Sequence, residues 1–150
     1  MTTKILVPID LADLPTMEKV LKAAIQQAEA SKGALTVMTV VPDMITGVDY
    51  RYAIRGETGG SEEYDLKEIV QEALDRLNDI VSKRVPSGMK VNTISRHGTV
   101  YEQVLNVAEE MGADQIVIGA HRPAVSDFLL GPNTARIVRH ATCSVNVVRN

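Results

Sequence analysis

The stretch that decides the fold is Lys4-Ile5-Leu6-Val7-Pro8-Ile9-Asp10, close to the amino terminus of the chain. Residues 5–9 of this stretch are apolar without interruption, and residues 115–119 form a second, mainly apolar run. A strand that is apolar on both faces is typical of the centre of a parallel sheet covered by helices above and below. We therefore expect these two runs to be the central strands of an α/β fold.

Short apolar runs alternate along the chain with stretches of helical period. The other runs rich in valine and isoleucine are residues 35–41, 91–95 and 144–148. Between the runs, apolar residues recur every three or four positions, and the last such stretch begins near Pro132. This alternation is typical of βαβ units. It predicts a doubly wound three-layer sandwich, with a five-stranded parallel sheet and four helices, in one domain spanning residues 1–150.

Local signals predict where the helices begin and end. The first helix should end where Gly33 takes a left-handed conformation, and the second should open after Ser61. The third should begin at Thr99, which has capping-box spacing to Glu102, and stop at Gly112.

Composition excludes several classes of protein. The 150 residues are 45% hydrophobic and 23% charged, with a net charge of −3 and no block of like charges, so nucleic acid is not an expected partner. No window is long enough to span a bilayer, and we expect a cytoplasmic protein. Cys143 is the only cysteine, which we interpret as a small buried hydrophobe rather than a reactive thiol.

Two strand ends carry residues suited to a ligand. Asp10 follows the first strand, while the fourth strand ends in Gly119-Ala120-His121-Arg122 and leads to Gly131-Pro132-Asn133-Thr134. In doubly wound sheets, ligands bind beyond the carboxyl ends of the strands, where the strand order reverses. A glycine lets a ligand approach the backbone, and a helix that starts at Gly131 offers N–H groups to an anion. Together these features favour a nucleotide.

Each feature also has a plainer interpretation that the residues leave open. Asp10 can serve only to order the turn before the first helix, and Gly131-Pro132 is a common way to start a helix. His121 and Arg122 can be ordinary loop residues. Residues 42–60, which are too polar and broken for a core element, are interpreted as either a lid or a mobile loop.

The whole pattern resembles the universal stress protein family across nearly the full chain. The opening strand, Thr39-Val40-Val41-Pro42 at the second strand end, and the closing segment Arg139-His140-Ala141-Thr142-Cys143-Ser144-Val145 are similar to family segments. The most specific similarity is Gly119-Ala120-His121-Arg122 followed by Leu129-Leu130-Gly131, in the short-spacer His-Arg-Pro form of one bacterial branch. With this resemblance we expect the strand order 3-2-1-4-5.

The resemblance also implies a ligand, an adenine nucleotide: ATP, or ADP or AMP, with Mg²⁺ accompanying it. It implies that Asp10 accepts from the ribose or adenine and that Val40 lies against the base. Glycine, histidine and arginine after the fourth strand would line the ribose and phosphate path, and the start of the last helix would donate to phosphate. The full set of implied binding residues is Pro8, Ile9, Asp10, Val40, Gly119, His121, Arg122, Gly131, Asn133 and Thr134.

Missing motifs argue against fast catalysis. There is no glycine-rich loop ending in Lys-Ser or Lys-Thr and no GxGxxG after the first strand. In the family's nucleotide-binding members, a second glycine stands where this chain has Arg122 and a small hydroxyl residue where it has Pro132. Arg122 is the only cation near the predicted phosphate loop, so efficient phosphoryl transfer is not expected.

Three function classes follow. The leading hypothesis is a nucleotide-binding module of stress response or signalling with little or no turnover. The second is a nucleotide-free dimeric interaction protein on the same scaffold, and the third is a slow ATPase. The run Ser144 to Val148 would leave an apolar sheet edge, and the resemblance points to a homodimer through it.

Overall fold

The computed structural model describes residues 2–42, 66–120 and 131–149 of the chain. Within these ranges the strands are β1 (Lys4–Pro8), β2 (Ala34–Pro42), β3 (Val91–Gly98), β4 (Gln115–Gly119) and β5 (Ser144–Val148). The helices are α1 (Leu14–Ser31), α3 (Leu66–Arg84), α4 (Val100–Met111) and α5 (Pro132–His140).

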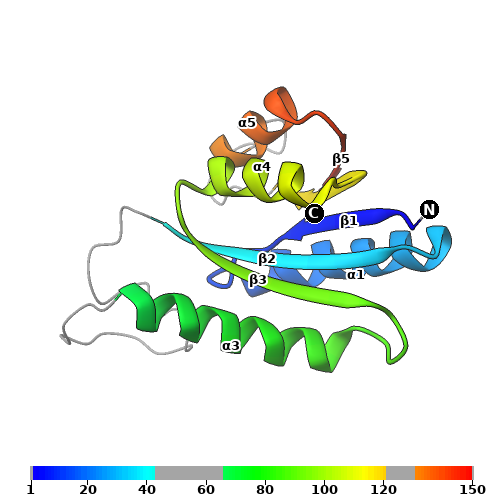
Figure 1. Ribbon diagram of the computed structural model, residues 1–150, viewed down its shortest axis with the longest axis horizontal. Coiled ribbons are helices and arrows are strands. Elements are labelled where there is room, and N and C mark those ends of the chain that lie inside the picture. The colour runs from blue at the N-terminus through cyan, green and yellow to red at the C-terminus, as the bar shows by residue number, and fades with distance from the viewer. Residues whose placement is uncertain (1, 43–65, 121–130, 150) are drawn as a thin grey trace.

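The strands form one parallel sheet in the order β3-β2-β1-β4-β5, which confirms the predicted α/β architecture and strand order. Helices α1 and α3 cover one face of this sheet, and α4 and α5 cover the other (Figure 1). β1 and β2 both run from the side where the amino terminus lies toward the opposite side, so their carboxyl ends share one edge of the molecule. None of the described helices is long and apolar enough to cross a membrane.

The central strand β1 supplies side chains to both layers of the core. Ile5 and Val7 belong to the cluster built with α1 and α3, whereas Leu6, which points the other way, belongs to the cluster built with α4 and α5. All three residues are fully buried. The unbroken apolar run in the sequence is therefore the consequence of a strand covered on both faces.

The end of α1 differs from the expectation. Lys32, not Gly33, takes the left-handed conformation, with φ of 53°. Gly33 is required for another reason, because a Cβ on it would lie 2.7 Å from the backbone oxygen of Thr3. That same oxygen accepts from the Ala34 amide at 2.9 Å, which starts the pairing of β1 with β2.

The start of α4 is only partly as predicted. Thr99 is the N-cap residue, but its side chain makes no capping hydrogen bond, so the capping box expected with Glu102 is wrong. The helix ends at Gly112 with φ of 64°, as predicted. Ser61 lies outside the described residues. Cys143 is partly buried against the α4 side of the core, and desolvation by this burial raises the pKa of its thiol.

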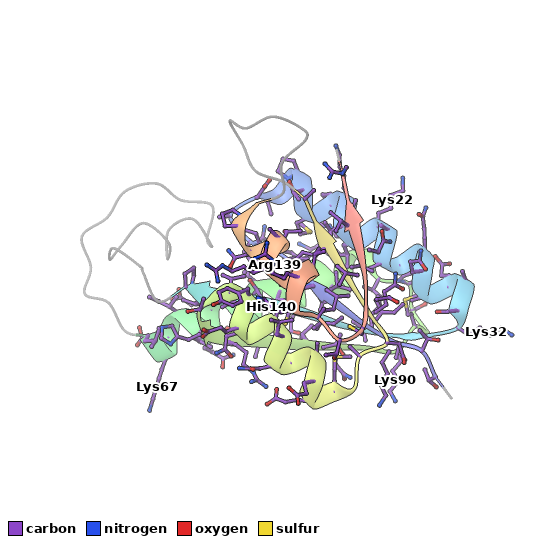
Figure 2. The ribbon with its side chains drawn as sticks, turned by 90° about the horizontal axis from the view of Figure 1, so that it is seen from above. Lys22, Lys32, Lys67, Lys90, Arg139 and His140 are labelled. Atoms are coloured by element: carbon purple, nitrogen blue, oxygen red, sulfur yellow. The ribbon has the colours of Figure 1, made fainter. Side chains whose placement is uncertain are left out.

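The left-handed lysine generates a stability prediction. Lys32 is an exposed residue that extends from the periphery of the molecule (Figure 2), so its side chain can be removed without loss of core packing. Lys32→Gly should raise the free energy of unfolding by about 1 kcal/mol, because glycine adopts this conformation without steric cost. Gly33→Ala should lower it by about 1–3 kcal/mol through the clash with Thr3. Urea unfolding of both variants checks this pair, and equal effects of the two would contradict it.

Candidate functional site

A cavity of about 650 Å³ lies at the carboxyl ends of β1, β2 and β4. β1 stands between β2 and β4. The helix that follows β1 is α1, which covers one face of the sheet, whereas the helix that follows β4 is α5, which covers the other face. The helices that follow these two neighbouring strands therefore lie on opposite faces, which is the arrangement that opens a ligand crevice in doubly wound sheets.

Two groups of residues line the cavity. The first comes from the ends of β1 and β2 and from the start of α1, and the second from α4, the end of β4 and the start of α5. The first group is Pro8, Ile9, Asp10, Ala12, Asp13, Thr16, Met17, Val20, Met38, Thr39, Val40 and Pro42. The second group is Val100, Val104, Ile118, Gly119, Gly131, Pro132, Asn133 and Thr134.

The structure brings together every predicted binding residue that it describes. These residues are Pro8, Ile9, Asp10, Val40, Gly119, Gly131, Asn133 and Thr134, which lie far apart in the sequence and all line the same cavity. His121 and Arg122 lie outside the described residues, as does most of the segment interpreted as a lid or mobile loop.

Asp10 is held in a tight turn between β1 and α1. Its Oδ1 accepts from the Ala12 amide at 2.9 Å, and its carbonyl oxygen accepts from the Asp13 amide at 3.1 Å. The helix cap proper is Asp13, whose Oδ1 accepts from the Thr16 amide at 3.3 Å. Asp10 thus orders the turn, as its plainer interpretation held. A carboxylate has about four lone-pair sites, so this bond does not exhaust its capacity to accept from a ligand.

The amino terminus of α5 forms the opposite wall. Gly131 is the N-cap residue in an extended conformation without a side-chain cap, and Pro132 occupies the first turn. The first amides of a helix have no intrahelical partner, and they carry the positive end of the helix dipole. Because proline lacks an N–H group, the amides of Asn133 and Thr134 remain as the donors of this first turn.

Two side chains of this first turn are used within the protein. The hydroxyl of Thr134, which is 6% exposed, donates to the carbonyl oxygen of Gly119 at 2.7 Å. Oδ1 of Asn133 accepts from the amide of Tyr101 at 3.2 Å and thereby caps α4 in place of the Thr99 side chain. These bonds fix α5 to the end of β4 and to the start of α4. An anion at this wall would therefore be met by backbone N–H groups.

The charged groups of the cavity are distributed unevenly. Asp10 and Asp13 lie at the α1 end, and no Lys, Arg or His is found among the lining residues that the structure describes. Those parts of the chain also contain no group of three or more His, Cys, Asp or Glu that would hold a metal ion. Among the residues that the structure describes, the cavity thus has an anionic end at α1 and an uncharged end with backbone donors at α5.

Several lining residues were missed from the sequence. Met17, Val20, Val100 and Val104 carry the ordinary helical stripe, and nothing in that pattern separates cavity wall from core. Thr39 offers a weak signal, because it is a hydroxyl residue in an otherwise apolar part of β2.

Comparison with known proteins gives a consistent result. The family model described as the universal stress protein family matches residues 1–149. Universal stress protein G from Shigella flexneri is 31% identical over 145 residues, which cover 97% of this chain and 97% of that protein.

Solved structures share the fold. The universal stress protein UspA from Lactobacillus plantarum has a TM-score of 0.69 at 23% identity, covering 98% of this chain and 97% of that chain. A universal stress protein in complex with cAMP has a TM-score of 0.60 at 19% identity, covering 99% of this chain and 97% of that chain. The universal stress protein from Archaeoglobus fulgidus in complex with dAMP has a TM-score of 0.54 at 20% identity, covering 97% of this chain and 96% of that chain.

The bond from Thr134 to Gly119 generates a prediction for the wall of the cavity. Thr134→Val should lower the free energy of unfolding by about 1 kcal/mol, because the Gly119 carbonyl oxygen loses its donor in a part-buried place. Thr134→Ser keeps the hydroxyl, so its free energy of unfolding should fall clearly less. Urea unfolding compares the free energies of unfolding of the two variants, and an equal loss in both would contradict the prediction, because serine keeps the hydroxyl that donates to Gly119.

Proposed function

The chain belongs to the universal stress protein family, and we propose that it is an adenine-nucleotide-binding module of stress response or signalling with little or no catalytic turnover. The observation that carries this proposal is the cavity beyond β1 and β4, which has apolar walls, an aspartate at one end and a helix amino terminus at the other. Two proteins with this fold are described in complex with cAMP and with dAMP, which are both adenine nucleotides.

The charges of the cavity favour one orientation of the nucleotide. Phosphate belongs at the start of α5, where unpaired N–H groups and the helix dipole stabilise an anion. The same phosphate beside Asp10 and Asp13 would be repelled. The ribose and base therefore point to the α1 end, where Asp10 accepts from a sugar hydroxyl or from the base.

The base end offers the surroundings that a planar heterocycle needs. Val40 comes from the end of β2, Met17 and Val20 come from α1, and all three are buried apolar side chains that line the cavity. Ligand pockets are generally apolar with a few placed polar groups, and this end has that character. Pro8 and Ile9 complete the wall beside Asp10.

We propose ATP as the ligand, with ADP and AMP as its close relatives, and Mg²⁺ would arrive with the phosphates. His121 and Arg122 would lie along the ribose and phosphate path, and this role stays a prediction, as does the His-Arg-Pro branch of the family. We propose the cytoplasm as the place of action, in keeping with a chain whose single cysteine is no part of a disulfide.

The same residues argue for slow chemistry at most. Phosphoryl transfer needs neutralisation of charge and a positioned base. The described lining residues include no basic side chain, and the two carboxylates lie at the end of the cavity away from α5. The proposal is therefore a binder that responds to nucleotide, with slow ATP hydrolysis as the alternative.

A second candidate role, assembly through β5, rests on the contrast between the two sheet edges. In β3, the Thr93 hydroxyl is bonded to Asn78 at 2.5 Å and the Ser95 hydroxyl to the Val70 carbonyl at 3.0 Å, so this edge strand carries polar side chains that are bonded to α3. β5 presents only partly buried valines around Asn146. An apolar edge without such protection favours pairing with another strand. We propose a two-fold homodimer through β5, with or without nucleotide.

The orientation generates a binding prediction. Asp10→Asn keeps an oxygen for the Ala12 amide but removes the charge. It should weaken ATP and adenosine binding by about tenfold each while the free energy of unfolding changes little. Asp13→Asn makes the same change in the same cavity and should leave both affinities near wild type. Isothermal titration calorimetry measures the affinities of both variants for ATP and for adenosine. Unchanged affinity of a folded Asp10→Asn variant would show that Asp10 does not contact the ligand.

The assembly proposal generates a second prediction. Light scattering should give twice the chain mass for the wild type, and Asn146→Lys on β5 should shift the protein to monomer, because a lysine on an edge strand opposes pairing. Asn92→Lys places the same change on β3 and should leave the dimer intact. A wild type that is monomeric at tens of micromolar, roughly the range for weak association, would contradict the proposal.

A further inference from the structure

The hydroxyl of Thr39 in β2 is buried without a partner. The residue is 1% exposed, and its oxygen has no hydrogen-bond partner among the residues that the structure describes. A buried polar group that is not hydrogen-bonded costs free energy, since it has lost its water and gained nothing in exchange. Valine, which has almost the same shape, would fill this place in β2 without that cost.

Thr39 borders the cavity rather than the closed core. It lines the cavity together with Ile9, Met17 and Val20. Pro8 pairs with Met38 at the end of the β1 ladder, so Thr39 stands one residue beyond the last pair with β1. By the period of two along a strand, it shares a face with Val37 and Val41, which pack on the α1 side of the sheet.

The surroundings decide what kind of group meets this hydroxyl. Asp10 and Asp13 line the same end of the cavity, so an anion is disfavoured there. The lining side chains on the same face of the sheet, Ile9, Met17 and Val20, are apolar. A neutral, flat group with one polar edge fits these walls, and a purine base is such a group. This step rests on the nucleotide binding proposed above.

We infer that Thr39 is a ligand-contacting residue whose hydroxyl exchanges a hydrogen bond with the polar edge of the base. A hydroxyl both donates and accepts, so it can serve a ring nitrogen or an exocyclic amine. Rotation about χ1 exchanges the methyl group and the hydroxyl, which brings the oxygen to the cavity side when a ligand supplies a partner. In the unliganded protein, the unsatisfied Thr39 hydroxyl then lowers the free energy of unfolding, and the same hydroxyl recognises the base when the ligand is bound.

The test uses the full-length protein with ATP, adenosine and inorganic tripolyphosphate as probes. Thr39→Val should bind ATP and adenosine about three- to tenfold more weakly, which is the effect of one neutral hydrogen bond. Its affinity for tripolyphosphate should equal that of the wild type. Without added ligand its melting temperature should rise by about 2–4 °C, because the unsatisfied hydroxyl is gone.

Two control variants separate contact from packing. Thr39→Ser keeps the hydroxyl and should keep the affinity for ATP. Thr36→Val makes the same change at another buried threonine of β2 that does not line the cavity, and it should bind ATP as the wild type does.

The inference is overturned if Thr39→Val binds ATP as tightly as the wild type, or if its weaker binding comes with a lower melting temperature or an equal loss for tripolyphosphate. If the wild type binds neither ATP nor adenosine, the proposed function fails and the inference fails with it. The wild-type titration therefore tells the two failures apart.

Discussion

The structure depends on one constraint, which is that β1 must be covered on both faces. Its side chains alternate between two cores, with Ile5 and Val7 toward α1 and α3 and Leu6 toward α4 and α5. Because both faces are covered, the helix that follows β1 lies on one face of the sheet, and the helix that follows the neighbouring strand β4 lies on the other. The cavity lies at this reversal of strand order, which is where a ligand crevice opens in doubly wound sheets.

The two ends of this cavity differ because two different kinds of helix start meet there. At α1, the carboxylates of Asp10 and Asp13 satisfy backbone amides and leave an anionic end. At α5, Gly131 and Pro132 provide no side-chain cap, and Asn133 directs its side-chain oxygen to α4 instead. Backbone donors therefore remain for a ligand at the start of α5. A nucleotide, which is anionic at one end and neutral at the other, matches this polarity.

Much of this arrangement is predictable from the sequence, and the exceptions share a cause. Periodicity predicts β1, β4 and the helices, because burial on both faces or on one stripe leaves a local signature. The left-handed conformation expected of Gly33 is wrong, because the residue is small in order to lie close to Thr3, which directly precedes the neighbouring strand β1. The capping expected of Thr99 is wrong because Asn133, from a helix distant in the sequence, caps α4 instead. Thr39 was missed as a site residue because an unpartnered hydroxyl is visible only once its surroundings are known.

The central claim is that an adenine nucleotide lies across the carboxyl ends of β1, β2 and β4 with its phosphates at α5. Amide chemical-shift mapping on titration with ATP tests this claim most directly. The account predicts saturable shifts at Ile9 and Val40 and at Gly131, Asn133 and Thr134, with adenosine reproducing the first group and not the second. Shifts confined to β3 or α3, or no saturable shifts at all with ATP, would contradict it.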